Sequence, residues 1–253
     1  WRQISNGPRL AVATVPDSEC ASLSIYIPAG SRDESGLPTG LAHFVEHMIF
    51  KGTERRSARE LSFEIENGGG QLNACTSEDQ TMYKESPADH IGDLISKALW
   101  GDHPLGNSIS GSLESISKID RSTLLDFRKR HYFREDLVIA AAGPFLPDEI
   151  MEMISPHLPL KFGPSIAAIP FDRTKVISGH IKDQRETDQL QLAMAWHTPG
   201  RHAEARFALR MLSMMLGETA SSRLFLELRE ERGLCYQISS DVTFFKETGA
   251  LEI

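Results

Sequence analysis

Extended runs and helical patterns follow one another along this 253-residue chain without the strict alternation that a parallel, doubly wound sheet requires. The extended runs Arg9–Thr14 and Ala21–Ile27 predict a hairpin, and the residues after Thr39 predict a helix over Leu41–Phe50. The capping-box pattern Ser57-Ala-Arg-Glu60 starts a second helix, which the glycines that follow it end. This mixture favours an α+β fold.

Later segments predict both kinds of element. The predicted strands are Gln71–Cys75, Thr81–Glu85, Leu137–Ala142, Lys175–His180, Leu190–His197, Tyr236–Phe245 and Ala250–Ile253, and the predicted helices are Pro87–Trp100, Asp120–Tyr132, Pro147–His157, Ala203–Leu216 and Ser221–Arg232. Four prolines and a glycine crowd residues 156–170, so we place a linker at 161–170 between domains at 1–160 and 171–253. Because the last residues form a strand pattern with no closing element, we expect the second domain to be incomplete.

Composition and charge narrow the classes of partner. The net charge is −8 and the pI is about 5.6. Because the sequence has no cluster of Lys and Arg that could bind the phosphates of a nucleic-acid backbone, we expect no nucleic-acid partner. Apolar runs stay well below 18 residues, so we expect no membrane span. Cys20, Cys75 and Cys235 lack paired spacing and are expected to be free thiols in a reducing compartment.

The strongest chemical pattern is His43-Phe-Val-Glu46-His47, which lies inside a predicted helix. Residues four apart share a helix face, so both imidazoles can bind one metal ion, and neutral imidazole is a good zinc ligand. A carboxylate beside that metal can take a proton from water whose pKa the ion has lowered. The alternative is a helix whose histidines only cap or form hydrogen bonds. The order His-x-x-Glu-His is a known metallopeptidase motif.

Other segments carry a resemblance that spans nearly the whole chain. They are Gly40–Thr53, Gly69–Ser77, Thr81–Tyr83, Gly101–Gly106, Tyr132, Ala140–Gly143, Ser221–Phe225 and Arg229–Tyr236. Together with the histidine motif they closely resemble the insulinase-like, M16-type (inverzincin) zinc metallopeptidases, which include the processing peptidases, the pitrilysins and the respiratory-complex core proteins. The resemblance implies two homologous domains, each a mostly antiparallel sheet with helices packed on one face.

The resemblance also implies roles in catalysis. His43 and His47 would be zinc ligands, and Glu46 would be the general base. Arg229 and Tyr236 are seven residues apart, the spacing at which related enzymes polarise the scissile carbonyl from the second domain. The alternative for Arg229 is a solvated helix face with charge pairing, and the alternative for Tyr236 is an aromatic residue packed in the core.

Substrate and partners follow from the same resemblance. Asn73 and Ala74 would lie on an edge strand that accepts a peptide as a further strand. We therefore expect a zinc-dependent endopeptidase that hydrolyses extended peptides or unfolded segments, assembled as a homodimer or as a heterodimer with a related half. The rival hypothesis is a non-catalytic core or partner subunit of the same fold, and a metal-free interaction module is a third. A bacterial cytoplasm is favoured over a mitochondrial matrix.

The sequence departs from the family at the third zinc ligand, a glutamate on a later helix. In this chain, the position at the family's spacing after the second histidine, His47, falls at residues 122–124, Ser-Thr-Leu, whose side chains cannot take the place of that glutamate. Only Lys84–Trp100 fills an interval in which the family has several dozen residues, so the glutamate segment is absent. The segments that flank the absent one would therefore join between Ile91 and Lys97, and we call this junction the seam. Glu85 and Glu114 are the possible replacement ligands.

Two explanations of this seam make opposite predictions. In one, the protein has lost the segment and keeps an incomplete two-histidine site. In the other, which we favour, the continuous numbering has closed over residues missing from the printed chain. The second predicts a step between consecutive Cα atoms much longer than the ~3.8 Å of a trans peptide. A continuous helix there would contradict it.

Overall fold

The structure is a computed structural model that describes residues 1–4, 7–77, 87–172, 179–184 and 190–253. The chain divides into two compact units, one made of Trp1–Tyr83 and Ile109–Ala168 and the other of Lys84–Ser108 and Ile169–Ile253. Each unit combines helices with a sheet, so the predicted α+β fold is confirmed. The boundary after Ala168 falls inside the predicted linker, but residues 84–108 join the second unit rather than the first.

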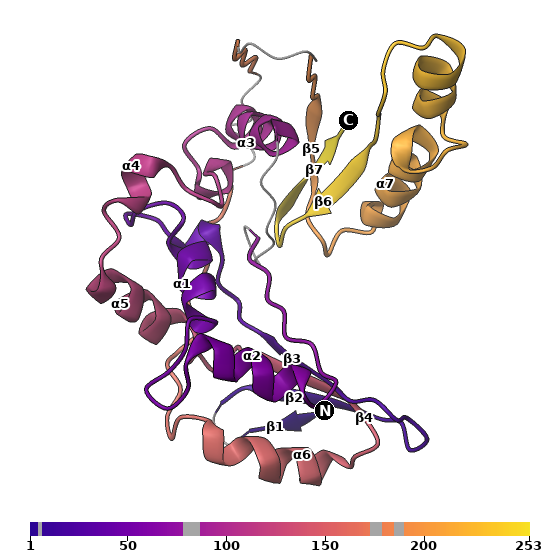
Figure 1. Ribbon diagram of the computed structural model, residues 1–253. Helices are drawn as coiled ribbons and strands as arrows, with labels where there is room; N and C mark the ends of the chain where they lie inside the picture. The colour runs from indigo at the N-terminus through magenta and orange to yellow at the C-terminus, as the bar shows by residue number, and fades with distance from the viewer. Residues whose placement is uncertain (5–6, 78–86, 173–178, 185–189) are drawn as a thin grey trace. The chain divides into compact units, whose positions relative to one another are not determined.

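The first unit contains a four-stranded sheet of β1 (Arg2–Gln3), β2 (Arg9–Thr14), β3 (Ser22–Tyr26) and β4 (Val138–Gly143) (Figure 1). The strand order is β1-β2-β4-β3, with β4 parallel to β2 and antiparallel to β3. The predicted hairpin of β2 and β3 is therefore wrong, because β4 lies between them. Residues 15–21, which connect β2 to β3, form a longer connection than the two to five residues typical of a hairpin.

Two clusters of buried side chains hold the helices of this unit in place. Helix α6 (Pro147–Ile154) packs against the sheet, and α1 (Leu41–Ile49) packs against α5 (Arg121–His131). The first cluster contains Ile4, Leu10, Leu137, Ile139, Ala141 and Ile150, and the second contains Leu41, Ala42, Val45 and Phe127. The face of α1 that bears Leu41 is thus fixed by burial, which is the main source of stability for so short a helix.

The other described helices of the first unit are η1 (Ser31–Asp33), α2 (Ala58–Glu66), α4 (Leu113–Ile116) and the short η3 (Ser155–His157), which directly follows α6. Helix α2 starts at the predicted capping box: the Ser57 hydroxyl accepts a hydrogen bond from Glu60 N, and a Glu60 carboxylate oxygen accepts one from Ser57 N. Two of the four backbone donors that every helix start leaves without a partner are satisfied in this way.

The second unit contains an antiparallel sheet with the order β5-β7-β6. Its strands are β5 (Ala195–Pro199), β6 (Asp241–Phe244) and β7 (Thr248–Glu252). Its helices are α3 (Pro87–Trp100), η2 (Pro104–Gly106), α7 (Ala205–Ser213) and the π-helical segments η5 (Met214–Glu218) and η6 (Phe225–Glu231). Trp100 lies at the centre of its core, edge-to-face with Phe171 and Phe245.

Helix α3 spans the predicted seam. It runs without interruption from Pro87 to Trp100 and includes every residue from Ile91 to Lys97. Which of the two explanations holds for this chain stays a prediction. Residues on both sides of the seam form one helix with apolar residues on one face, so the short connection is compatible with a folded unit.

One predicted strand is absent from the structure, and two others lie wholly or mostly outside its described residues. Gln71–Cys75 forms no strand, and the Asn73 side-chain oxygen accepts a hydrogen bond from Ala74 N, which engages the donor that a strand partner would need. The predicted strand Thr81–Glu85 and most of Lys175–His180 fall outside the described residues.

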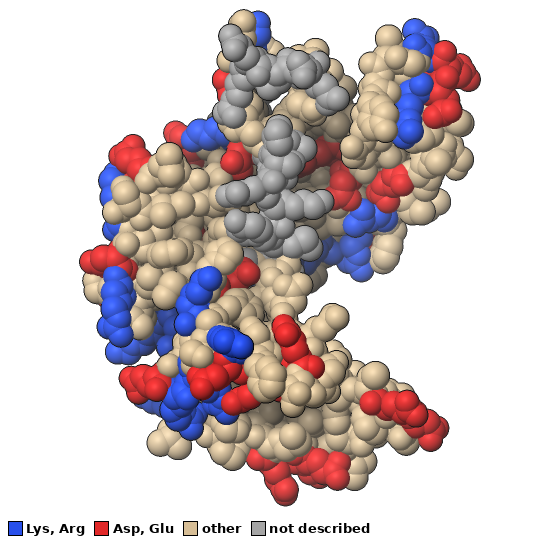
Figure 2. Space-filling view, in the orientation of Figure 1, with Lys and Arg blue, Asp and Glu red and all other residues tan. Residues whose placement is uncertain are grey.

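The described surface mixes charges. On the face that Figure 2 shows, Lys and Arg side chains lie among Asp and Glu side chains over both units. Across the described ranges, no helix is both long and apolar enough to cross a bilayer.

Gly40, the residue before α1, has a backbone that a side chain would disturb. Its φ is +90°, and a Cβ atom there would lie 2.7 Å from the Ser110 carbonyl oxygen. We expect Gly40→Ala to lower the free energy of unfolding by about 2–4 kcal/mol, measured by urea denaturation. Gly36→Ala is the control, because Gly36 has φ +74° with nothing within 4 Å and should lose only about 1–2 kcal/mol. Equal losses would contradict the steric argument.

Candidate metal centre and catalytic residues

Helix α1 brings the two histidines of the motif together. The Nε2 atoms of His43 and His47 are 3.1 Å apart, and the two rings meet edge to face. Two imidazoles that bind one tetrahedral zinc ion at 2.0–2.1 Å would place their nitrogens about 3.3 Å apart. His43 is buried and His47 is half-buried, so the pair is partly shielded from water. This pair therefore fits two positions of a zinc site.

Glu46 lies on the same helix and is also buried. The Thr76 hydroxyl donates a hydrogen bond of 2.7 Å to Glu46 Oε2, and Thr76 itself is buried. Burial raises the pKa of Glu46 above its usual value, because a charged carboxylate loses hydration there. The carboxylate is thus held in one orientation and is a stronger base than an exposed glutamate.

Two further residues lie close enough to Glu46 for its charge to affect them. Burial, and to a lesser extent the negative charge of Glu46, raises the pKa of Tyr132 to about 12. The same two causes raise the pKa of the Cys75 thiol. Tyr132 and Cys75 are therefore neutral at pH 7, and Glu46 is the one base among these three groups.

A third zinc ligand is not found among the residues that the structure describes. Within those ranges, no group of three or more His, Cys, Asp or Glu side chains is arranged to hold a metal ion. Glu114, one of the suggested replacements, forms an exposed ion pair with Lys118 at 2.6 Å. Glu85, the other, lies outside the described residues. The residues in place thus fit two of the three protein ligands that a catalytic zinc takes.

The predicted substrate-binding residues occupy an extended, unpaired stretch rather than a strand. Asn73 is exposed and Ala74 is half-buried, two residues before the Thr76 that contacts Glu46. Their predicted role in binding a peptide stays a prediction.

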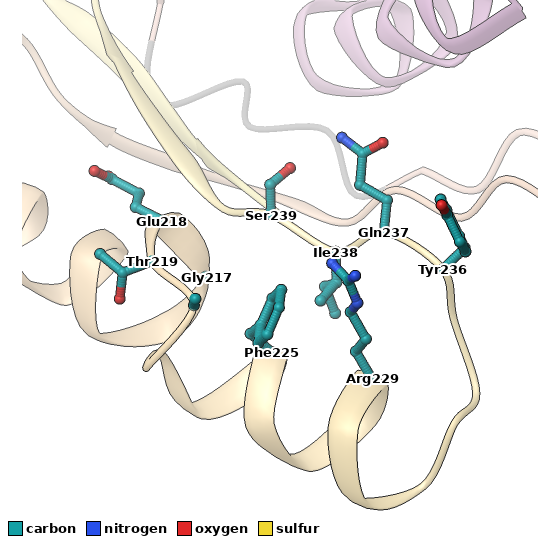
Figure 3. Close-up of a pocket in the computed structure, with 10 residues that line it drawn as sticks. Gly217, Glu218, Thr219, Phe225, Arg229, Tyr236, Gln237, Ile238 and Ser239 are labelled. Carbon is teal, nitrogen blue, oxygen red and sulfur yellow. The ribbon is translucent and has the colours of Figure 1, made fainter.

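Arg229 and Tyr236 belong to the second unit and lie together. The Arg229 guanidinium carbon is 4.6 Å from the centre of the Phe225 ring and 5.7 Å from that of Tyr236. Figure 3 shows these side chains along a pocket of about 370 Å³, with Phe225 and Arg229 projecting from η6 and Gln237 following Tyr236 on the next segment. The two cation–π contacts restrict the guanidinium to one region of this pocket.

The structure also tests the alternatives for these two residues. Tyr236 is 85% exposed and precedes β6, so the core-aromatic alternative is wrong. Arg229 is half-buried and lies 3.6 Å from the adjacent Glu230, which is not the pairing three or four residues apart that the charge-pairing alternative expects. The predicted catalytic roles of both residues remain predictions.

Comparison with known proteins places the chain in a family. The model of the insulinase family (peptidase family M16) matches residues 9–98, and that of the peptidase M16 inactive domain matches residues 118–253. An uncharacterized zinc protease of Mycobacterium leprae is 32% identical over 99% of this chain and 67% of its own length. The chain belongs to the insulinase family. The zinc protease YmxG of Bacillus subtilis, also uncharacterized, is 28% identical over 98% of this chain and 71% of its own length.

Solved structures share the fold of this chain. The peptidase M16 inactive domain from Pseudomonas fluorescens has a TM-score of 0.77 at 18% identity, and covers 99% of this chain and 73% of that one. A protease from Helicobacter pylori has a TM-score of 0.75 at 17% identity over 99% of this chain and 73% of its own. Within the matched region this insulinase-family chain is shorter than the M. leprae relative, since the alignment of the two runs over 302 residues and this chain has 253.

Proposed function

We propose that this chain is a zinc-dependent endopeptidase of the insulinase type, acting on extended peptides or unfolded segments. The observation that carries the proposal is the convergence of the His43 and His47 Nε2 atoms to 3.1 Å on the helix that also carries the buried Glu46. The zinc-protease names of the relatives support the same chemistry.

Each residue would have a distinct task. His43 and His47 would hold the metal, which supplies Lewis acidity that lowers the pKa of water and polarises a carbonyl. Glu46 would accept the proton of the attacking water and return it to the leaving amine. Because Thr76 engages Oε2, we assign Oε1 to the water. Arg229 and Tyr236 would stabilise the oxyanion, and Asn73 and Ala74 would align the peptide.

A second candidate function is that of a non-catalytic subunit that binds peptides or a related half. It is supported by the lack of a third metal ligand beside His43 and His47 among the described residues. Zinc sites with two protein ligands bind the metal more weakly than sites with three or four, since each ligand lost removes one bond to the metal. The two candidates therefore differ in zinc affinity.

Zinc content and peptide cleavage distinguish the endopeptidase from the non-catalytic subunit. We expect the purified chain to contain close to one zinc ion by elemental analysis and to cleave a quenched peptide library. Removal of zinc with a chelator should abolish cleavage, and added zinc should restore it. Little zinc together with no cleavage in the presence of added zinc would reject the endopeptidase and support the binding subunit.

A further inference from the structure

The start of α1 is capped from a distance by Glu34. This residue follows η1 and is only 1% exposed. Its Oε2 accepts a hydrogen bond of 2.9 Å from Gly40 N, and its Oε1 accepts one of 2.7 Å from Ala42 N. The first N–H groups of a helix have no acceptor inside the helix, and Gly40, the residue at the cap position, has no side chain to supply one. Glu34 supplies both acceptors.

A second contact holds the same end of the helix from the other side. The Ser115 hydroxyl, at the start of α4, donates a hydrogen bond of 2.8 Å to the Thr39 carbonyl oxygen. A Cβ atom on Gly111 would lie 2.3 Å from that oxygen, so the two segments touch backbone to backbone. The first turn of α1 is therefore clamped between Glu34 and the segment that leads into α4.

This end of the helix determines where the metal-binding side chains lie. Ala42, which donates to Glu34, directly precedes His43, and Glu46 follows one turn later. Each residue of a helix turns by about 100°, so a loosened first turn changes the direction of His43 relative to His47. The 3.1 Å separation of the two Nε2 atoms depends on that direction.

We propose that Glu34 is a positioning residue for the metal centre, because its two carboxyl oxygens fix the first turn of α1 and with it the convergence of His43 and His47. The inference rests on the proposed function for the identity of the metal. Glu34 itself touches neither the metal nor the substrate, and it acts through the backbone of α1.

To accept hydrogen bonds from both Gly40 N and Ala42 N, the side chain at position 34 needs two acceptor oxygens. Burial raises the pKa of Glu34 to about 8, against the lowering effect of the hydrogen bonds from Ala42 and Gly40. Both protonation states keep two oxygens toward the helix. A glutamine has one acceptor oxygen and an NH₂ group that would face a backbone N–H, so one donor would lose its partner.

The test compares Glu34→Gln with Glu60→Gln in the full chain. Glu60 is the matched control because it accepts a hydrogen bond from Ser57 N at the start of α2, a helix without any candidate ligand. With Co²⁺ as the probe, we expect Glu34→Gln to weaken binding by about 10- to 100-fold and to change the Co²⁺ absorption bands. Glu60→Gln should bind Co²⁺ like the wild type.

Amide hydrogen exchange of the metal-free protein gives a second readout. Glu34→Gln should accelerate exchange along α1 as far as His47 by about tenfold or more, since a buried donor loses its partner. Equal losses of Co²⁺ affinity in both variants, or an unchanged affinity in Glu34→Gln, would overturn the proposal. If the wild type binds no Co²⁺, the proposed function fails, and the positioning role is then overturned by exchange that stays slow at His43–His47.

Discussion

Replacing Glu46 by glutamine is expected to lower kcat/KM for peptide cleavage by about 10²- to 10⁴-fold, because a general base contributes a factor of that size. Glutamine keeps the shape of the side chain and an acceptor for the Thr76 hydroxyl, but it cannot take a proton from water. The loss should appear in kcat with a quenched peptide substrate. Zinc content and the unfolding midpoint should match those of the wild type.

The control for this variant is Glu114→Gln, which changes the same functional group at an exposed ion pair with Lys118. We expect it to leave zinc content and turnover unchanged, since such a pair contributes little. A loss of zinc in Glu114→Gln would instead identify it as a ligand in the assembled protein. Unchanged turnover in Glu46→Gln would reject Glu46 as the base.

Features set by neighbours in the sequence could be predicted without the structure. The helix predicted at Asp120–Tyr132 forms as Arg121–His131, because Asp120 accepts a hydrogen bond from Thr123 N and so caps the first turn. The capping box of α2 is formed as predicted for the same reason. Strand order could not be predicted, because β4 separates β2 from β3 although it comes more than one hundred residues after them.

The candidate site likewise combines residues that a local sequence pattern predicts with residues that only the fold brings close. The spacing of His43 and His47 on a helix is a local pattern, and the structure brings their Nε2 atoms together. Thr76 and Glu34 carried no such signal, because Thr76 reaches Glu46 from thirty residues away and Glu34 satisfies backbone donors rather than a side chain. Only a folded chain shows that either residue supports the site.

The predicted linker at 161–170 shows how a buried side chain can override a local pattern. Its prolines predicted a linker between domains, but Arg134 holds its first part against the first unit. The guanidinium donates to the Ile166 and Pro28 carbonyl oxygens, both at 3.1 Å, and to the Asp136 carboxylate. Gly163 N also donates to the Phe133 carbonyl oxygen at 2.8 Å. The segment up to Ala168 is therefore part of the first unit.

Arg134→Met should lower the free energy of unfolding by about 3–5 kcal/mol, because Arg134 is only 2% exposed and its removal leaves three half-buried acceptor groups, including the Asp136 carboxylate, without this partner. Arg210→Met is the control, since Arg210 also has two partners, Glu218 and Asp241, but its side chain is 49% exposed. That change should cost less than about 1 kcal/mol in urea denaturation. Arg134→Met should also speed proteolytic cleavage within 161–168, because the segment loses its anchor while the rest of the unit stays folded. Equal stability losses in the two variants, or unchanged cleavage there, would mean that burial of this guanidinium does not hold the segment in place.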